Sequence, residues 1–399
     1  MRPVSAAGAD PEDRSPTEAP DGQTEEKSDM NEHEYQEAIH DVIYLAGCAV
    51  NDTIPDANRV RSMNLENLYR AANRHLLTAI TAMALEVAGI RDGAFTQAKG
   101  KAIRKVAAMD ADMIELFNRF DRMGIWYMPL KGSVLKDYYP AYGMRQMSDH
   151  DILFDSSRAD DVKSIMKSMG FSCESFGTGV HDTYHKEPVS NFEMHRALFA
   201  PASGDRLCDY YLNTKDRLVK DEGTGYRYHF SSEDFYIYMI VHEYKHYSAG
   251  GTGLRSLLDT YVYISKCGDK LDWKYITSEV QKLGIADFER QNRSLALHLF
   301  SNTALTDAEQ EMLSYIISSG TYGTVEHSVE NAIRKAGSKG RYLVSRLFLP
   351  MEIVKTCYPF FYRHKVFLPM LCLYRIGRAL TVSWKRTRKE LRVLMKGIQ

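Results

Sequence analysis

The sequence predicts an α+β protein in which a small mixed sheet is flanked by helical regions on both sides. Apolar residues recur at helical spacing over residues 33–50 and 64–89, which predicts one amphipathic helix in each range, and again almost continuously beyond Ser231. Between these regions, short segments rich in β-branched and aromatic residues are bounded by turn residues, as strands are. This arrangement favours a small sheet with helices packed on it.

The first two strands of the predicted sheet lie before and after a short turn and a helix. A long helix is predicted from about residue 101 to 122, and Gly124 is a usual C-terminal stop. Residues 125–130 then form a strand that leads into the turn at 131–133 and a following helix. Residues 150–155 form the second strand.

A hairpin completes the predicted sheet. A helix over 157–169 follows the second strand, and the segments 181–187 and 190–198 pair around Pro188-Val189. This hairpin brings Glu193 back beside the second strand.

Length and composition predict more than one region. The chain has 399 residues, which exceeds a typical single domain. Residues 1–29 are rich in Pro, Gly, Ser and acidic side chains and are predicted to be a disordered acidic tail; Met30, directly before the first helical pattern, is a candidate start. We expect an N-terminal helical region over 30–100, the sheet-bearing core over 101–205, and a C-terminal helical region with a basic end over 206–399.

Cysteine usage and hydropathy bear on the compartment. Six cysteines lie scattered, without the spacing of a zinc site or of a disulfide framework. No run of about 18 apolar residues occurs, so no membrane-spanning helix is predicted. The N-terminus lacks the basic and apolar regions of a signal peptide. These observations favour a cytoplasmic protein.

The stretch from Lys131 to Asp151 carries the most informative motif. Asp149 and Asp151 are two residues apart, so on a strand both side chains point to one face. Two carboxylates, joined by a third from a neighbouring strand, suit hard divalent cations such as magnesium, which keeps substrate phosphates in its shell. Gly132 and Ser133 open a helix, where unpaired backbone N–H groups can hold phosphate oxygens. The pattern predicts phosphate chemistry.

The ordered motifs resemble those of the uncharacterised bacterial nucleotidyltransferase family within the DNA polymerase beta-like superfamily. In that superfamily Gly-Ser precedes an Asp-x-Asp on the next strand, and a third carboxylate follows later, often in Glu-x-His. Glu193-Met194-His195 matches the later motif. Further family features are matched by Leu130, Lys131, Tyr139, Pro140 and Arg145. The chain departs from the family at His150, where Ile is more usual, and we expect that side chain to point away from the carboxylates.

The resemblance implies a polymerase-beta-like fold for the core and a defined reaction. A nucleoside triphosphate such as ATP would donate its nucleotidyl group to a hydroxyl of an acceptor, with two Mg²⁺ ions as cofactors and pyrophosphate as the leaving group. The acceptor stays open between a small molecule, a peptide and RNA.

The resemblance also implies a role for each matching residue. Asp149 and Asp151 would bind both metal ions and Glu193 the catalytic one. If the hairpin differs from this prediction, Glu187 or Asp182 would be the next candidates for the third ligand. Gly132 and Ser133 would hold the β- and γ-phosphates, while Lys131 and Arg145 neutralise triphosphate charge.

A further candidate group is His242, Lys245 and His246. The two histidines are four residues apart and share a helix face. Such a pair can bind zinc, but His-Glu-x-x-x-His is one residue longer than the metalloprotease pattern. We therefore expect these residues to face the nucleotide phosphates or the acceptor.

The C-terminal end is strongly basic. From Arg334 to Gln399, sixteen Lys and Arg residues stand against two acidic residues. A block of this kind predicts an anionic partner, although a solvated helix face gives the same pattern. Interleaved aromatic residues leave RNA contact and interfacial membrane contact open, and core packing explains them as well. A buried apolar stripe is predicted at Leu373, Ile376, Leu380 and Trp384.

Two alternatives from other classes stay open. The first is a catalytically inactive nucleotide-binding module, because a fold does not fix its function. It would bind a nucleoside triphosphate without releasing pyrophosphate. The second is an RNA-associated protein that acts through its basic C-terminal region, which steeply salt-dependent RNA binding would reveal.

Overall fold

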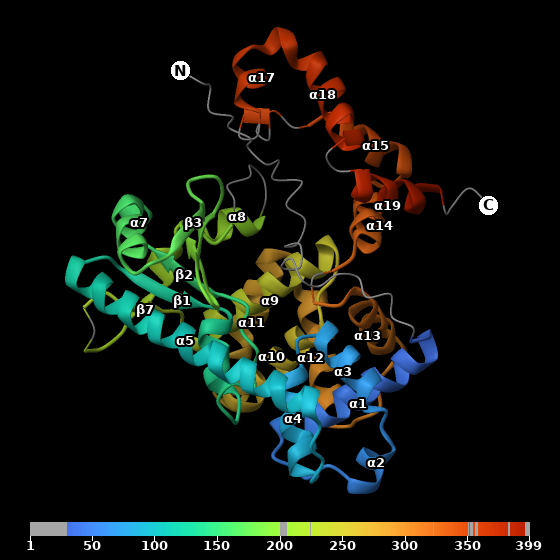
Figure 1. Cartoon of the computed structure of the whole chain (residues 1–399). Helices are drawn as coiled ribbons and strands as arrows, with labels where there is room; N and C mark the ends of the chain where they lie inside the picture. Colours follow the sequence, from blue (N-terminus) through green and yellow to red (C-terminus); the bar gives the residue numbers. More distant parts are fainter. Residues whose placement is uncertain are drawn as a thin grey trace. The chain divides into compact units, whose positions relative to one another are not determined.

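The computed structural model describes residues 30–199, 206–223, 225–321, 323–349, 351, 354–355, 358–381 and 384–395 (Figure 1). The predicted acidic tail lies outside the described residues. The chain divides into two compact units. The larger unit comprises Ser28–Tyr244 and Leu254–Ser314, and the smaller unit contains Lys245–Gly253 and Tyr315–Gln399.

The larger unit contains a five-stranded mixed sheet. Its strands lie in the order β1-β2-β5-β4-β3, in which β2 and β5 are parallel and the other pairs antiparallel. The strand bounds are β1 (Tyr127–Leu130), β2 (His150–Phe154), β3 (Ser172–Ser175), β4 (His181–Lys186) and β5 (Ser190–His195). The predicted α+β class, mixed sheet and β4–β5 hairpin are confirmed. Sequence reasoning missed β3 and the small pair β6 (Val219–Lys220) and β7 (Tyr228–His229).

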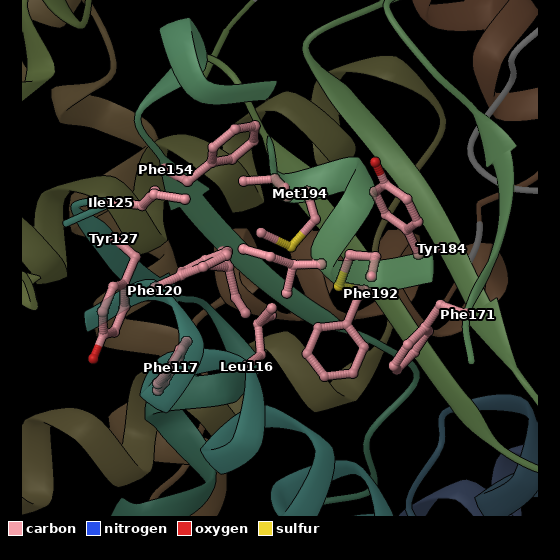
Figure 2. Packing of buried hydrophobic residues seen from close by; sticks show 14 of the residues in the cluster. Leu116, Phe117, Phe120, Ile125, Tyr127, Phe154, Phe171, Tyr184, Phe192 and Met194 are labelled. Atoms are coloured by element: carbon pink, nitrogen blue, oxygen red, sulfur yellow. The ribbon is translucent and has the colours of Figure 1, made fainter. Parts of the chain in front are cut away.

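One face of this sheet forms the main core with two helices, α5 (Gly93–Met123) and α7 (Ala159–Ser168) (Figure 2). Alternate residues of each strand point to this face because side chains alternate across a pleat. The core from the strands comprises Tyr127, Ile152, Phe154, Tyr184, Phe192 and Met194. As predicted, α5 ends at Gly124, whose φ of 67° is a left-handed conformation that glycine adopts without strain. The opposite face of the sheet carries polar side chains beside the buried Met128 and Leu130.

The single helix predicted over 64–89 is wrong. The structure has α3 (Leu65–Arg74) and α4 (Thr78–Val87), separated at Leu76, which has a φ of 55°. The break places the buried ring of His75 between two partners. Its Nδ1 accepts from the backbone N–H of Leu254 at 3.2 Å, and its Nε2 lies 2.9 Å from the hydroxyl of Tyr35. Burial lowers the pKa of His75 to about 3, so the ring is neutral.

The larger unit contains further helices. Their bounds are α1 (Glu32–Val50), α2 (Ala57–Ser62), α6 (Gly132–Leu135), α8 (Arg206–Tyr210), α9 (Ser232–Ala249), α10 (Leu254–Cys267), α11 (Trp273–Leu283), α12 (Ala286–Phe300) and α13 (Asp307–Ser319), of which α9 and α13 continue into the smaller unit. Among the described residues, no helix combines the length and the apolar character needed to cross a bilayer.

The smaller unit is helical and its core is small. Its later helices are α14 (Val325–Ala336), α15 (Lys339–Leu347), α17 (Pro359–Arg363), α18 (Leu368–Thr381) and α19 (Trp384–Met395). A buried cluster forms around Val354, Tyr358 and Leu371. The predicted buried stripe is wrong, because Leu373 is 70% exposed and Ile376 and Trp384 are exposed as well. The side chain of Leu380 lies outside the described residues.

A buried carboxyl joins three helices of the larger unit. Glu243 of α9 accepts hydrogen bonds from Asn292 of α12 at 3.0 Å and from Thr260 of α10 at 3.3 Å. Burial raises the pKa of Glu243 to about 8, although the hydrogen bond from Asn292 opposes the rise. Glu243 is therefore largely protonated near neutral pH.

This carboxyl should make stability fall with rising pH. Unfolding releases the proton because an exposed glutamate has a pKa near about 4.3. Between that value and about 8, the free energy of unfolding should decrease by up to about 1.4 kcal/mol per pH unit. Urea unfolding across this range measures the slope. Glu243→Gln should flatten it, while Glu66→Gln, on the exposed side of α3, should not; equal slopes in all three proteins would contradict the assignment.

Candidate functional site

The polar face of the sheet gathers acidic and histidine side chains by strand register. Asp151 of β2 stands opposite Glu193 of β5, and His181 of β4 stands opposite His195 of β5. Paired residues point to the same face of a sheet. Asp149 directly precedes β2 and, two residues from Asp151, faces the same way. Three carboxylates and two imidazoles thus meet on the face opposite the main core.

Short contacts tie these side chains together. The ammonium of Lys131 donates to Oδ1 of Asp151 at 2.6 Å, and Nε2 of His195 lies 2.8 Å from the same oxygen. Nε2 of His195 is also 3.5 Å from Oε2 of Glu193. Nε2 of His181 is 3.6 Å from Oε1 of Glu193. His195 therefore bridges the carboxylates of the two parallel strands.

The carboxylates respond differently to this environment. Burial opposes the ionisation of Asp151, but Lys131 and His195 outweigh it and hold its pKa well below the usual range. Burial raises the pKa of Asp149 to about 7, and the charges of Asp151 and Glu193 add to the rise. Asp151 is therefore ionised, whereas the site disfavours the charged form of Asp149.

Three residues from surrounding helices complete the site. Sequence reasoning missed Lys105 and Tyr238 and left Arg255 outside the predicted binding residues. Lys105 of α5 donates to the backbone oxygen of Ser148 at 2.9 Å, and its charge acts on Asp149. Arg255 of α10 also acts on Asp149 and donates to the backbone oxygen of Gln146 at 3.0 Å.

The third is Tyr238 of α9, which is buried. Burial raises its pKa, and Asp151 and Glu193 add to the rise against the opposing charge of Lys131. No local pattern marks these three residues, because each comes from a different helix. The register of the predicted hairpin does place His181 opposite His195 and could have found it.

The turn between β1 and α6 is strained and tightly packed. Lys131 has φ 46° and ψ −123°, a conformation that is unfavourable for a residue with a side chain. Gly132 follows, and a Cβ there would lie 2.5 Å from Nη1 of Arg145. Only glycine fits against that guanidinium. From this strained backbone conformation, the ammonium of Lys131 reaches Asp151.

Ser133 and His150 connect the turn to α5. Oγ of Ser133 lies 2.8 Å from Nδ1 of the fully buried His150, and Nε2 of His150 lies 3.4 Å from Oδ1 of Asp110. As predicted, His150 points to the opposite side from the carboxylates. Ser133 is itself buried, so its hydroxyl serves this contact in the structure.

Arg145 is buried and paired. Its guanidinium donates to both oxygens of Asp259 on α10, from Nε at 2.7 Å and from Nη2 at 2.8 Å. The hydroxyl of Tyr139 donates to the same carboxylate at 2.8 Å. Two of the family-like residues, Tyr139 and Arg145, therefore anchor the loop before β2 to α10.

The candidate group on α9 is divided between the units. His242 belongs to the larger unit, where its ring centroid lies 6.3 Å from that of Tyr238. Lys245 and His246 belong to the smaller unit. Their predicted contact with nucleotide or acceptor stays a prediction.

The donor set fits a hard divalent cation. Asp149, Asp151 and Glu193 offer carboxylate oxygens on one face. Burial, together with repulsion from Asp151 and Glu193, raises the pKa of Asp149 and so disfavours its charge. A divalent cation would relieve that repulsion. Glu193 also belongs with His181 and His195 to a group whose ligand atoms lie within 4.8 Å of one another.

Comparison with known proteins agrees with this geometry. The family described as uncharacterised nucleotidyltransferase matches residues 61–301, which is more than half of the chain and contains the whole site. The protein belongs to this family, and the family supports nucleotidyl transfer as its general activity.

Two further comparisons add less. A crystal structure of an antigenic nucleotidyltransferase-like protein from Paracoccidioides brasiliensis is 14% identical, with 49% of this chain and 93% of that chain covered. The TM-score between the two structures is 0.31. No curated protein matches the chain significantly.

The buried pair of Arg145 and Asp259 should matter for stability. Asp259→Asn leaves the guanidinium buried without its counter-charge, which should lower the free energy of unfolding by about 3–5 kcal/mol. Chemical unfolding measures the change. Asp287→Asn, which breaks the exposed pair with Arg290, is the matched control and should cost less than about 1 kcal/mol. Equal losses would show that the buried pair is not structural.

Proposed function

We propose that this protein is a magnesium-dependent nucleotidyltransferase that moves a nucleoside monophosphate from a triphosphate to an acceptor hydroxyl and releases pyrophosphate. One observation carries the proposal: Asp149, Asp151 and Glu193 converge on one face of the sheet beside a strained Gly-Ser turn. Family membership supports the same chemistry.

The metal ligands are assigned to these three carboxylates. Asp149 and Asp151 would hold both Mg²⁺ ions, and Glu193 would hold the catalytic one. When bound, two such ions stabilise the attacking and leaving oxygens of an in-line displacement at the α-phosphorus. His195 lies between Asp151 and Glu193 and is a positioning residue, because it fixes the orientation of both carboxylates.

The chain's own cations would hold the triphosphate. Lys131 is the nearest, since its ammonium already lies against Asp151. Lys105 and Arg255 act on Asp149 and are candidates for the same role. The backbone N–H groups of Gly132 and Ser133 begin α6 and would contact the β- and γ-phosphates.

Arg145 takes a different role from the one its motif predicts. Its bidentate pair with Asp259 is buried, and an Arg held this way is not available to a phosphate without exposing the aspartate's charge. We assign Arg145 as a positioning residue that shapes the Gly132 turn.

One experiment tests the reaction directly. The purified protein is incubated with each α-labelled nucleoside triphosphate, Mg²⁺ and a cell extract, and the labelled product is identified. Label transfer with release of pyrophosphate is the expected result. Triphosphate binding without release would identify a nucleotide-binding module instead.

Asp149→Asn should separate catalysis from stability. The site disfavours the charge of Asp149, so its removal should leave the free energy of unfolding above pH 7 unchanged or raised. Turnover should fall at least about a hundredfold, because a ligand for the ions that stabilise developing charge is lost. Asp160→Asn, exposed on α7, is the control with wild-type turnover. Wild-type turnover in Asp149→Asn would contradict the metal assignment.

Asp151→Asn should lower both the turnover and the free energy of unfolding. It removes the carboxylate that Lys131 and His195 share, so those two side chains stay buried without their partner. Unfolding and turnover measured on the same preparation distinguish this variant from Asp149→Asn. An unchanged free energy of unfolding in Asp151→Asn would show that Lys131 and His195 do not depend on it.

Glu193→Gln should reduce turnover severely while it spares triphosphate affinity, because the Asp pair holds the nucleotide-bound metal. Single-turnover kinetics and equilibrium binding of the triphosphate measure the two effects. Glu187→Gln is the matched control, since Glu187 lies on the same hairpin and is 85% exposed. If Glu187→Gln loses turnover and Glu193→Gln keeps it, the third ligand has been assigned to the wrong residue.

A further inference from the structure

The smaller unit exposes an unusual amount of apolar surface. Among the described residues, most of the exposed large hydrophobic side chains lie between Leu343 and Met395. Exposed apolar side chains that gather into a patch mark an interaction site, because the contact of apolar surface with water is unfavourable. The apolar side chains that point outward therefore need an explanation beyond the packing of the unit.

The exposure is sharpest at the turn that joins α17 to α18 (Figure 1). Val366 is 88% exposed there. The exposed rings of Phe360 and Phe367 stack on each other with centroids 5.9 Å apart, and Met370, near the start of α18, is exposed as well. We call Phe360, Val366, Phe367 and Met370 the apolar tip.

The apolar tip rests on a small core. Tyr358 and Leu371, which flank it in sequence, are buried in one cluster, and Phe361 and Leu368 pack against that cluster. The turn is thus held in place from beneath, while its outer side chains point into water. This conformation depends on contacts within the unit.

Basic residues flank the apolar tip. Arg363 and Lys365 are exposed on either side of His364, between Phe360 and Val366. The surrounding segment from Arg334 to Gln399 carries sixteen Lys and Arg residues against two acidic ones. The occupant of this surface should therefore be both apolar and anionic.

We propose that the apolar tip and its flanking cations form a peripheral attachment surface for a bilayer that contains anionic phospholipids. Val366, Phe360 and Phe367 enter the boundary between head groups and acyl chains. Arg363 and Lys365 stay at the level of the phosphates, as basic residues do at such interfaces.

Charge and side-chain type favour a bilayer over other partners. Nucleic acid contacts use cations and stacking aromatics, and the aliphatic Val366 and Met370 gain nothing there. A second copy of the chain would bring the same excess of positive charge to the contact, which repels. A bilayer with anionic lipids satisfies both the aliphatic and the cationic side chains.

Vesicle binding of the full chain tests the proposal. The probe is a vesicle of phosphatidylglycerol and phosphatidylcholine in equal parts, with pure phosphatidylcholine as the neutral control. Binding to the anionic vesicle, weakened by salt, is the expected result. In Phe367→Trp, the new tryptophan should shift its emission to shorter wavelength when anionic vesicles are added. No nucleotide is present, so the outcome is independent of the proposed reaction.

Variants locate the surface. Val366→Ser should lower vesicle affinity about tenfold, since an apolar side chain leaves the interface. Arg363→Gln and Lys365→Gln should lower it about fivefold each. The matched control is Ile54→Ser, which removes a side chain that is 80% exposed on the larger unit and should leave affinity unchanged.

Four outcomes would overturn the proposal. The first two are equal binding to neutral and anionic vesicles, and an emission of Phe367→Trp that does not shift. The other two are RNA binding or self-association that these variants abolish, in a protein that does not bind vesicles. The last two would assign the surface to RNA or to a second copy.

Discussion

The parallel pairing of β2 with β5 is the constraint on which the rest of the site depends. Its register sets Asp151 opposite Glu193, and the pleat adds Asp149 to the same face. Burial of this face raises the pKa of Asp149, and repulsion from the charges of Asp151 and Glu193 adds to the rise. Lys131 and His195 offset part of this repulsion at Asp151. Lys131 donates to that carboxylate from a strained backbone conformation.

A second buried charge pair holds the turn in place. Asp259 receives Arg145 and Tyr139 from the loop before β2, so α10 and that loop are joined through one carboxylate. The guanidinium in turn packs against Gly132 and leaves no room for a Cβ. The buried pair of Arg145 and Asp259 thus helps to fix the position of the Gly-Ser turn. A residue can belong to a family motif because it shapes the turn, without touching substrate.

Much of the sheet and of the carboxylate set could be predicted from the sequence, because both depend on local patterns. Strand alternation places Asp149 and Asp151 together, and the hairpin around Pro188 returns Glu193 to them. The partner of Arg145 could not be predicted, since Asp259 is 114 residues away and the pairing exists only in the folded chain. The break at Leu76 was hidden for the same reason: the buried hydrogen bonds of His75 reach Tyr35 and Leu254.

The predicted burial of the apolar stripe in the smaller unit was wrong for a different reason. Helical periodicity shows that Leu373 and Ile376 lie near one another on a helix, but it does not show what that surface meets. In the larger unit, a wide sheet covers the apolar side of α5. In the smaller unit, the core around Tyr358 and Leu371 is too small to cover every apolar position. A periodic apolar stripe becomes part of a core only where the fold packs a second layer against it. In the smaller unit, basic residues surround the apolar side chains that stay exposed.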